Sequence, residues 1–81
     1  MNRTIAERIE ECTKITHQLN ELGIPIGCPG RTALRDIFRD WIYTGEAYVG
    51  KVPFNEWNRH AYILLPSRKD RQVIFVLRRN K

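Results

Sequence analysis

The stretch AYILLPSRKDRQVIFVLR, residues 61–78, decides the fold because it places two apolar runs on either side of one polar segment. The runs are rich in aliphatic and aromatic residues, which favour β-strands, whereas the segment PSRKDR (66–71) is short and highly charged. The sequence therefore predicts strands at 61–65 and 72–78 that pair as an antiparallel hairpin, with Pro66 marking the end of the first strand.

Neither strand of this hairpin alternates between apolar and polar residues, as a strand with one solvated face should. The segments 62–65 and 73–77 are apolar at every position. If helices covered one side of the sheet only, the other side would carry an apolar patch that is large for a monomer. That patch would contain Ile74 and Val76, with either Ile63 or the pair Tyr62 and Leu64.

Two interpretations of this second apolar side stay open. In the first, the chain's own loop at 53–60 folds over it and covers it with Phe54 and Trp57. In the second, a partner subunit covers it, and Trp57, Phe54, Ile74 and Val76 form a protein interface. Trp57 is the strongest candidate for an interface anchor, because a large aromatic residue in a polar loop brings much contact area.

Upstream of the hairpin, the segment 47–52 reads as one more strand, and Pro53 marks its end. The first half of the chain reads as helix. Thr4 and Glu7 match a capping box, and Gly23 followed by Pro25 is a strong stop signal. The apolar stripe of this first helix is Ile5, Ile9, Cys12, Ile15, Leu19 and Leu22.

A second helix follows a stiff connector at 24–31, with Thr32 as its expected cap and Thr44-Gly45 at its end. Its stripe is Leu34, Ile37, Phe38, Trp41 and Ile42, whereas Arg35, Asp36, Arg39 and Asp40 face away. We therefore expect one α+β domain over 1–81, in which a helical hairpin (3–44) packs on a three-stranded antiparallel β-meander (46–79).

The net charge of +5 lies wholly in residues 46–81, because residues 1–45 contain equal numbers of acidic and basic side chains. Such an excess favours phosphates or acidic protein surfaces. The candidates for that contact are Arg68, Lys69, Arg71, Arg78 and Arg79. A basic hairpin beside a helix pair resembles a winged helix, but the third helix is missing and the second helix carries no net charge. Tyr48, Tyr62 and Phe75 could stack on bases, although sheet packing is the favoured role.

No catalytic residues are predicted, because the chain offers no nucleophile–base pair and no paired carboxylates. No metal ligands are predicted either, since neither a C-x2-C nor an H-x3-5-H spacing occurs. Cys12 is expected in the core, and Cys28 is expected to be a buried loop residue. We expect no cofactor, no small-molecule substrate and no membrane span. Two cysteines without a signal peptide predict a protein of a reducing, intracellular compartment that is not secreted.

The segment from Gly50 to Leu77 resembles a pattern in small proteins of nucleocytoplasmic large DNA viruses. In that pattern a G-K-[IV] strand leads to an acidic residue, an arginine, a tyrosine–leucine strand and a final aliphatic strand. Here Gly50-Lys51-Val52, Glu56, Arg59 and Tyr62-Ile63-Leu64-Leu65 correspond to it. The resemblance implies a small viral protein, built into the virion as a minor capsid- or particle-associated component.

These features predict a non-enzymatic interaction protein whose partners are other subunits of an assembly. The alternative is a small basic module that binds nucleic acid through phosphate contacts.

Overall fold

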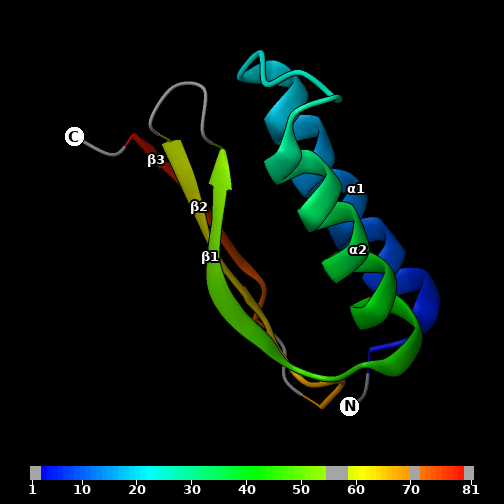
Figure 1. The fold of residues 1–81 in the computed structure, drawn as a ribbon. Coiled ribbons are helices and arrows are strands. Elements are labelled where there is room, and N and C mark those ends of the chain that lie inside the picture. The colour runs from blue at the N-terminus through cyan, green and yellow to red at the C-terminus, as the bar shows by residue number, and fades with distance from the viewer. Residues whose placement is uncertain (1–2, 55–58, 70–71, 80–81) are drawn as a thin grey trace.

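The chain folds into two antiparallel helices that lie on one face of an antiparallel sheet (Figure 1). The computed structural model describes residues 3–54, 59–69 and 72–79. Within these residues the elements are α1 (Ile5–Glu21), α2 (Pro29–Thr44), β1 (Tyr48–Phe54), β2 (Arg59–Leu65) and β3 (Ile74–Arg79), and the strand order is β1-β2-β3. The predicted α+β fold, a helical hairpin on a three-stranded meander, is confirmed.

Both ends of α1 follow the sequence signals. The backbone N–H of Glu7 donates to Thr4 Oγ1 over 3.1 Å, and the N–H of Thr4 donates to Glu7 Oε1 over 3.0 Å, which completes the capping box. After the helix, Gly23 adopts φ 77°, a conformation that glycine takes without steric cost. The N–H of Ile24 then donates to the carbonyl of Leu19 over 3.1 Å, and this places the Ile24 side chain in the core.

The buried stripe of α1 differs from the predicted one. Cys12, Ile15 and Leu19 are buried as expected, whereas Ile5, Ile9 and Leu22 are exposed. Arg8 takes the place of an apolar residue and is only 5% exposed. Its Nε donates to the carbonyl of Ile42 over 2.9 Å and its Nη1 to that of Arg3 over 2.7 Å. The guanidinium thus satisfies a carbonyl in the last turn of α2, where helix carbonyls lack intrahelical partners.

The start of α2 was predicted wrongly. The helix begins at Pro29, with Cys28 as a cap that makes no side-chain hydrogen bond, and Thr32 lies inside the first turn. Proline suits a first helical position because its fixed φ is helical and its missing N–H has no partner there. The predicted end is correct, since Gly45 closes the helix at φ 69°.

The approach of α2 to β1 requires a glycine at the start of the helix. A Cβ added to Gly30 would lie 2.5 Å from the carbonyl oxygen of Pro53 and would overlap the ring of Phe54. Phe54 is therefore packed under the helix. Pro53 lies within β1, so the prediction that it ends the strand is wrong; β1 is an edge strand, where proline is tolerated.

The core lies between the helices and the inner face of the sheet. Its fully buried residues include Trp41 on α2, Val52 on β1 and Ala61, Ile63 and Leu65 on β2. Trp41 Nε1 donates to the carbonyl of Pro66 over 2.6 Å, which ties the segment after β2 to the last turn of the second helix. Pro66 follows β2 directly, as predicted.

Candidate interaction surface

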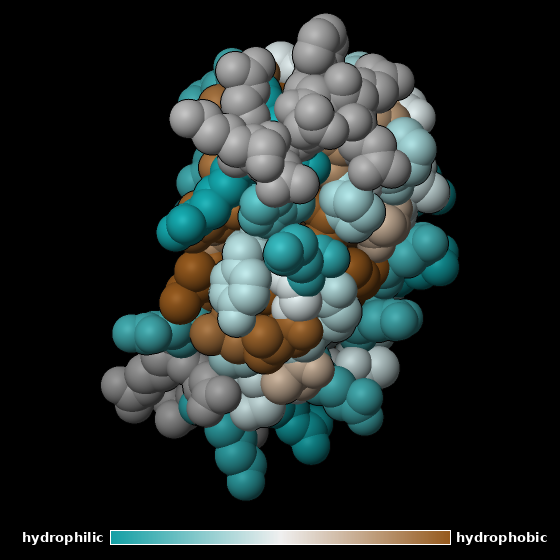
Figure 2. Space-filling view, turned by 60° about the vertical axis from the view of Figure 1, so that its left-hand side comes forward, coloured by the Kyte–Doolittle hydropathy of each residue, from teal (hydrophilic) through white to brown (hydrophobic). Residues whose placement is uncertain are grey.

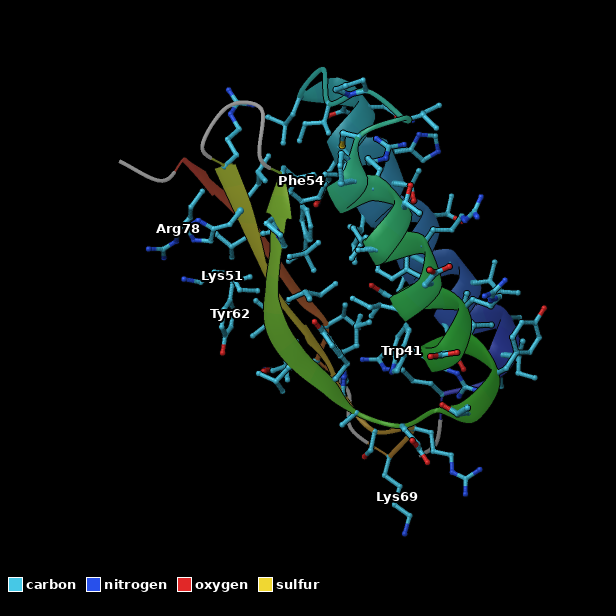
Figure 3. The ribbon with its side chains drawn as sticks, in the orientation of Figure 1. Trp41, Lys51, Phe54, Tyr62, Lys69 and Arg78 are labelled. Carbon is cyan, nitrogen blue, oxygen red and sulfur yellow. The ribbon has the colours of Figure 1, made fainter. Side chains whose placement is uncertain are left out.

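The open side of the sheet, here named the outer face, faces away from both helices. Antiparallel pairing places alternate residues of the three strands on it: Val49, Lys51 and Pro53 from β1, His60, Tyr62 and Leu64 from β2, and Ile74, Val76 and Arg78 from β3. In Figure 3 Lys51, Tyr62 and Arg78 project from this side, whereas Phe54 and Trp41 point into the space between sheet and helices.

The strand register arranges the outer face into three rows of different chemistry. Val49, Leu64 and Ile74 form an apolar row next to the turn between β2 and β3. Lys51, Tyr62 and Val76 form a mixed middle row, and Pro53, His60 and Arg78 form a polar row at the far end. Figure 2 turns this side forward and shows brown apolar side chains gathered below a group of hydrophilic ones.

Several apolar side chains of the outer face are exposed to solvent and do not belong to the core. The exposed fraction of the side chain is 57% for Val49 and 45% for Tyr62, and it is 38% for Ile74 and 37% for Val76. Burial nevertheless alternates along β2, where Ala61, Ile63 and Leu65 are buried and Tyr62 is exposed. The uninterrupted apolar runs therefore face two different environments, one covered by helices and one not.

The charges on the outer face are positive. Lys51 and Arg78 are exposed, and neither forms an ion pair with any carboxylate in the described residues. The ion pairs that the structure does describe join Lys14 to Glu10 and Glu11, and Arg39 to Asp36, all on the helices. An acidic group brought to this face would thus meet cations that have no described partner of opposite charge.

The four predicted interface residues fall into three groups. Ile74 and Val76 lie on the outer face, as expected for a patch that helices do not cover, and Tyr62 and Leu64 rather than Ile63 accompany them. Phe54 is 2% exposed and packs in the core, so its assignment to an exposed interface is wrong: strand parity turns it toward α2. Trp57 lies outside the described residues.

The structure separates the basic residues that the sequence analysis grouped. Arg68 and Lys69 are exposed in the turn after β2, and Arg78 lies at the opposite end of β3, as Figure 3 shows for Lys69 and Arg78. The turn is fastened by its backbone, because the N–H of Arg68 donates to Gly45 over 2.9 Å and its carbonyl accepts from the N–H of Arg3 over 2.8 Å. Arg71 and the side chain of Arg79 lie outside the described part.

Lys51, His60 and Tyr62 were not among the predicted site residues, although one signal in the sequence points to them. Each has the same strand parity as Ile74 and Val76 once the register is known. Alternation along one strand groups residues such as Tyr62 and Leu64, but which residues of different strands share a face depends on the pairing register, and the sequence does not state that register.

Both cysteines are buried, as predicted, and both thiols are free. Burial raises the pKa of the Cys12 thiol to about 12, and the neighbouring charge of Glu11 adds to this shift. A thiol with such a pKa remains protonated at neutral pH and is a poor nucleophile. Within the described residues, no cluster of three or more His, Cys, Asp and Glu side chains could bind a metal ion.

Comparison with known proteins adds no relative. No protein-family model matches the chain, and neither the curated proteins nor the solved structures contain a significant match. Among the described residues, neither helix has the length and apolar composition to cross a membrane.

Proposed function

We propose that this chain is a non-enzymatic interaction protein and that the outer face of the sheet is where a partner protein docks. The observation that carries the proposal is the apolar row Val49, Leu64 and Ile74, continued by Tyr62 and Val76, on the side of the sheet opposite the helices. Contiguous exposed apolar residues with a polar rim are typical of protein interaction sites.

A different protein fits this face better than a second copy of the chain does. Stacking two outer faces would bring Lys51 and Arg78 of both copies into one interface, with no described carboxylate on either face to neutralise them. Uncompensated charges in an interface cost free energy. The favoured partner therefore has an apolar centre with acidic side chains at the end that meets Lys51 and Arg78.

The similarity of residues 50–77 to small proteins of large DNA viruses extends the proposal. On that basis the assembly is a virion, the protein is a minor particle-associated component, and its partners are other subunits of the particle. The residues that carry the similarity include Lys51 and Tyr62, which lie on the outer face.

The test compares crosslinking in two matched surface variants. Ile74→Lys adds a charge to the outer face, and Leu22→Lys adds the same charge at the exposed end of α1. Both are expected to remain folded. A photo-crosslinker at position 62 in the native source should form defined adducts, and Ile74→Lys should abolish them whereas Leu22→Lys should not. Adducts that are equal in all three proteins, or that are never formed, would refute the docking role.

Nucleic-acid binding is the second candidate function. One observation favours the outer face over the basic turn with Arg68 and Lys69 as the binding site. Tyr62 is exposed on β2, directly opposite Lys51 on β1, and Arg78 lies in the neighbouring row. An aromatic ring with flanking cations on a sheet can stack on a base while the cations contact phosphates.

This second candidate has its own test. Binding to a single-stranded oligonucleotide should weaken steeply with salt. Tyr62→Ala and Lys51→Glu should each weaken it at least about fivefold, since the tyrosine loses about 1–3 kcal/mol of stacking. Lys69→Glu changes the net charge by the same amount at the other end of the sheet and serves as the control. Equal loss in both charge variants would indicate unspecific attraction and eliminate this site.

A further inference from the structure

A second exposed apolar surface lies between the helices. A groove of about 380 Å³ runs between α1 and α2, and a smaller hollow of about 170 Å³ adjoins it and shares Thr16, Arg35 and Phe38 with it. None of the described strand residues lines either one, so the groove does not belong to the outer face. Cys12 and Phe38 form part of its apolar floor.

Apolar residues that are not buried in the core lie along the rim of the groove. Ile26 is 76% exposed and lines the smaller hollow, and Tyr43 is 70% exposed and lines the larger one, as does the exposed Ile9. Ile9 belongs to the stripe that was expected in the core. Its side chain instead lies at the edge of the groove, beside α2.

One wall of the groove is a row of arginines. Arg31, Arg35 and Arg39 are spaced by four residues along α2, which sets them about 6 Å apart along the helix axis, and all three line the groove or its adjoining hollow. Neither lining contains an acidic residue among the described part of the chain. The charges of α2 lie on different sides: the arginines line the groove, whereas Asp40 lines a different hollow, between α2 and β1.

These arginines are only partly engaged within the chain. Arg31 donates to the carbonyl of Ile24 over 3.2 Å and to Asn20 Oδ1 over 3.1 Å, which fixes its position at the end of the row. Arg39 lies 3.6 Å from Asp36, but both side chains are exposed, and such pairs contribute little. Arg35 forms no ion pair with any carboxylate that the structure describes.

We propose that this groove binds an amphipathic helix with acidic flanks, supplied by a partner protein. The apolar floor and edges would receive the apolar stripe of such a helix, and the arginine row would face its carboxylates. From Arg31 to Tyr43 the groove follows thirteen residues of α2, which are twelve steps of about 1.5 Å or about 18 Å, and a partner helix of similar length would cover it.

A helix suits the groove better than nucleic acid does. A single strand would engage the arginines, but it would leave Ile9 and Ile26 facing phosphates or sugars, and Tyr43 is the one exposed aromatic ring in the described lining. The groove and the outer face lie on different sides of the molecule, so one chain could join two partners. The groove proposal does not depend on the outer face, because different residues form the two surfaces.

The experiment uses the full chain and a synthetic probe. The probe is a labelled peptide of about 15 residues with leucines at helical spacing and glutamates on both flanks, and its scrambled form has the same composition without the stripe. Fluorescence anisotropy should detect the helical peptide and not the scrambled one. Arg35→Glu should weaken binding at least tenfold, and Lys69→Glu, with the same change of net charge, less than about twofold.

An apolar pair of variants tests the floor separately. Ile9→Ser should weaken the peptide several-fold, whereas Ile74→Ser, an equivalent loss on the outer face, should leave it unchanged; thermal unfolding confirms that each variant is folded. Equal effects of Arg35→Glu and Lys69→Glu, equal binding of the scrambled peptide, or no binding at all would overturn the proposal. The proposal would also be overturned, in favour of nucleic acid, if an oligonucleotide displaced the peptide, bound more tightly than the peptide and lost its binding in Arg35→Glu.

Discussion

The two faces of the sheet carry similar apolar side chains but lie in different environments. On the inner face, Val52, Ala61, Ile63 and Leu65 are buried beneath the helices. On the outer face, Val49, Ile74 and Val76 are exposed and share the surface with Lys51 and Arg78. The difference shows that an uninterrupted apolar run in a small sheet can contain both core residues and residues that the helices leave exposed.

A matched pair of isoleucines gives the most direct way to break this comparison. Ile63 is fully buried and Ile74 is 38% exposed. Ile63→Ala should lower the free energy of unfolding by about 2–5 kcal/mol, because it removes buried methyl groups and leaves a cavity. Ile74→Ala should change it by about 0.5 kcal/mol or less. Chemical denaturation measures both, and similar losses would mean that the outer face is covered by the chain itself.

A charged residue on the buried side sharpens the comparison further. Arg8→Met keeps much of the side-chain volume but removes the hydrogen bonds to the carbonyls of Ile42 and Arg3. We expect a loss of about 1.5–3 kcal/mol in the free energy of unfolding, the usual contribution of hydrogen bonds to a charged group. Arg35→Met, on the exposed wall of the groove, is the control and should change stability by about 0.5 kcal/mol or less. A neutral Arg8→Met would contradict a clamping role.

Two glycines test the contact between α2 and β1. Gly30→Ala would push a methyl group against Phe54 and the carbonyl of Pro53, and should cost about 1–3 kcal/mol. Gly27 has no neighbour within 4 Å of an added Cβ, so Gly27→Ala should be neutral or should stabilise by up to about 1 kcal/mol. Differential scanning calorimetry of the two variants separates these outcomes, and the reverse order would refute the close approach.

The smallest expected effect is at the start of α1, outside both faces. The backbone N–H and hydroxyl of Thr4 lower the pKa of Glu7 from its ordinary value of 4.5. Since the folded-state pKa is the lower one, the stabilisation by Glu7 is present above pH 4.5 and is lost as the pH falls through the folded-state value. The difference in melting temperature between wild type and Glu7→Gln should therefore be largest at neutral pH and vanish in acid. A difference in melting temperature that does not change with pH would contradict a stabilising role of the Glu7 carboxylate.

Local signals in the sequence determined the elements and their order. The capping box at Thr4, the left-handed glycines Gly23 and Gly45 and the helical stripe around Trp41 each act within a few residues, so they could be interpreted directly. The hairpin predicted from residues 61–78 is present because apolar strand formers on both sides of a charged turn favour that pairing in any context. Ile74 and Val76 lie, as expected, on the side of the sheet that the helices do not cover.

Tertiary packing decided what the sequence could not. Phe54 turned inward because the register of β1 fixes its parity, and Arg8 was buried because the end of α2 offered it carbonyls. The arginine row of α2 became a groove wall only once α1 lay beside it. A sequence specifies which residues can be buried, but the choice among apolar and charged candidates depends on which elements meet. That choice is settled by contacts between residues far apart in the chain.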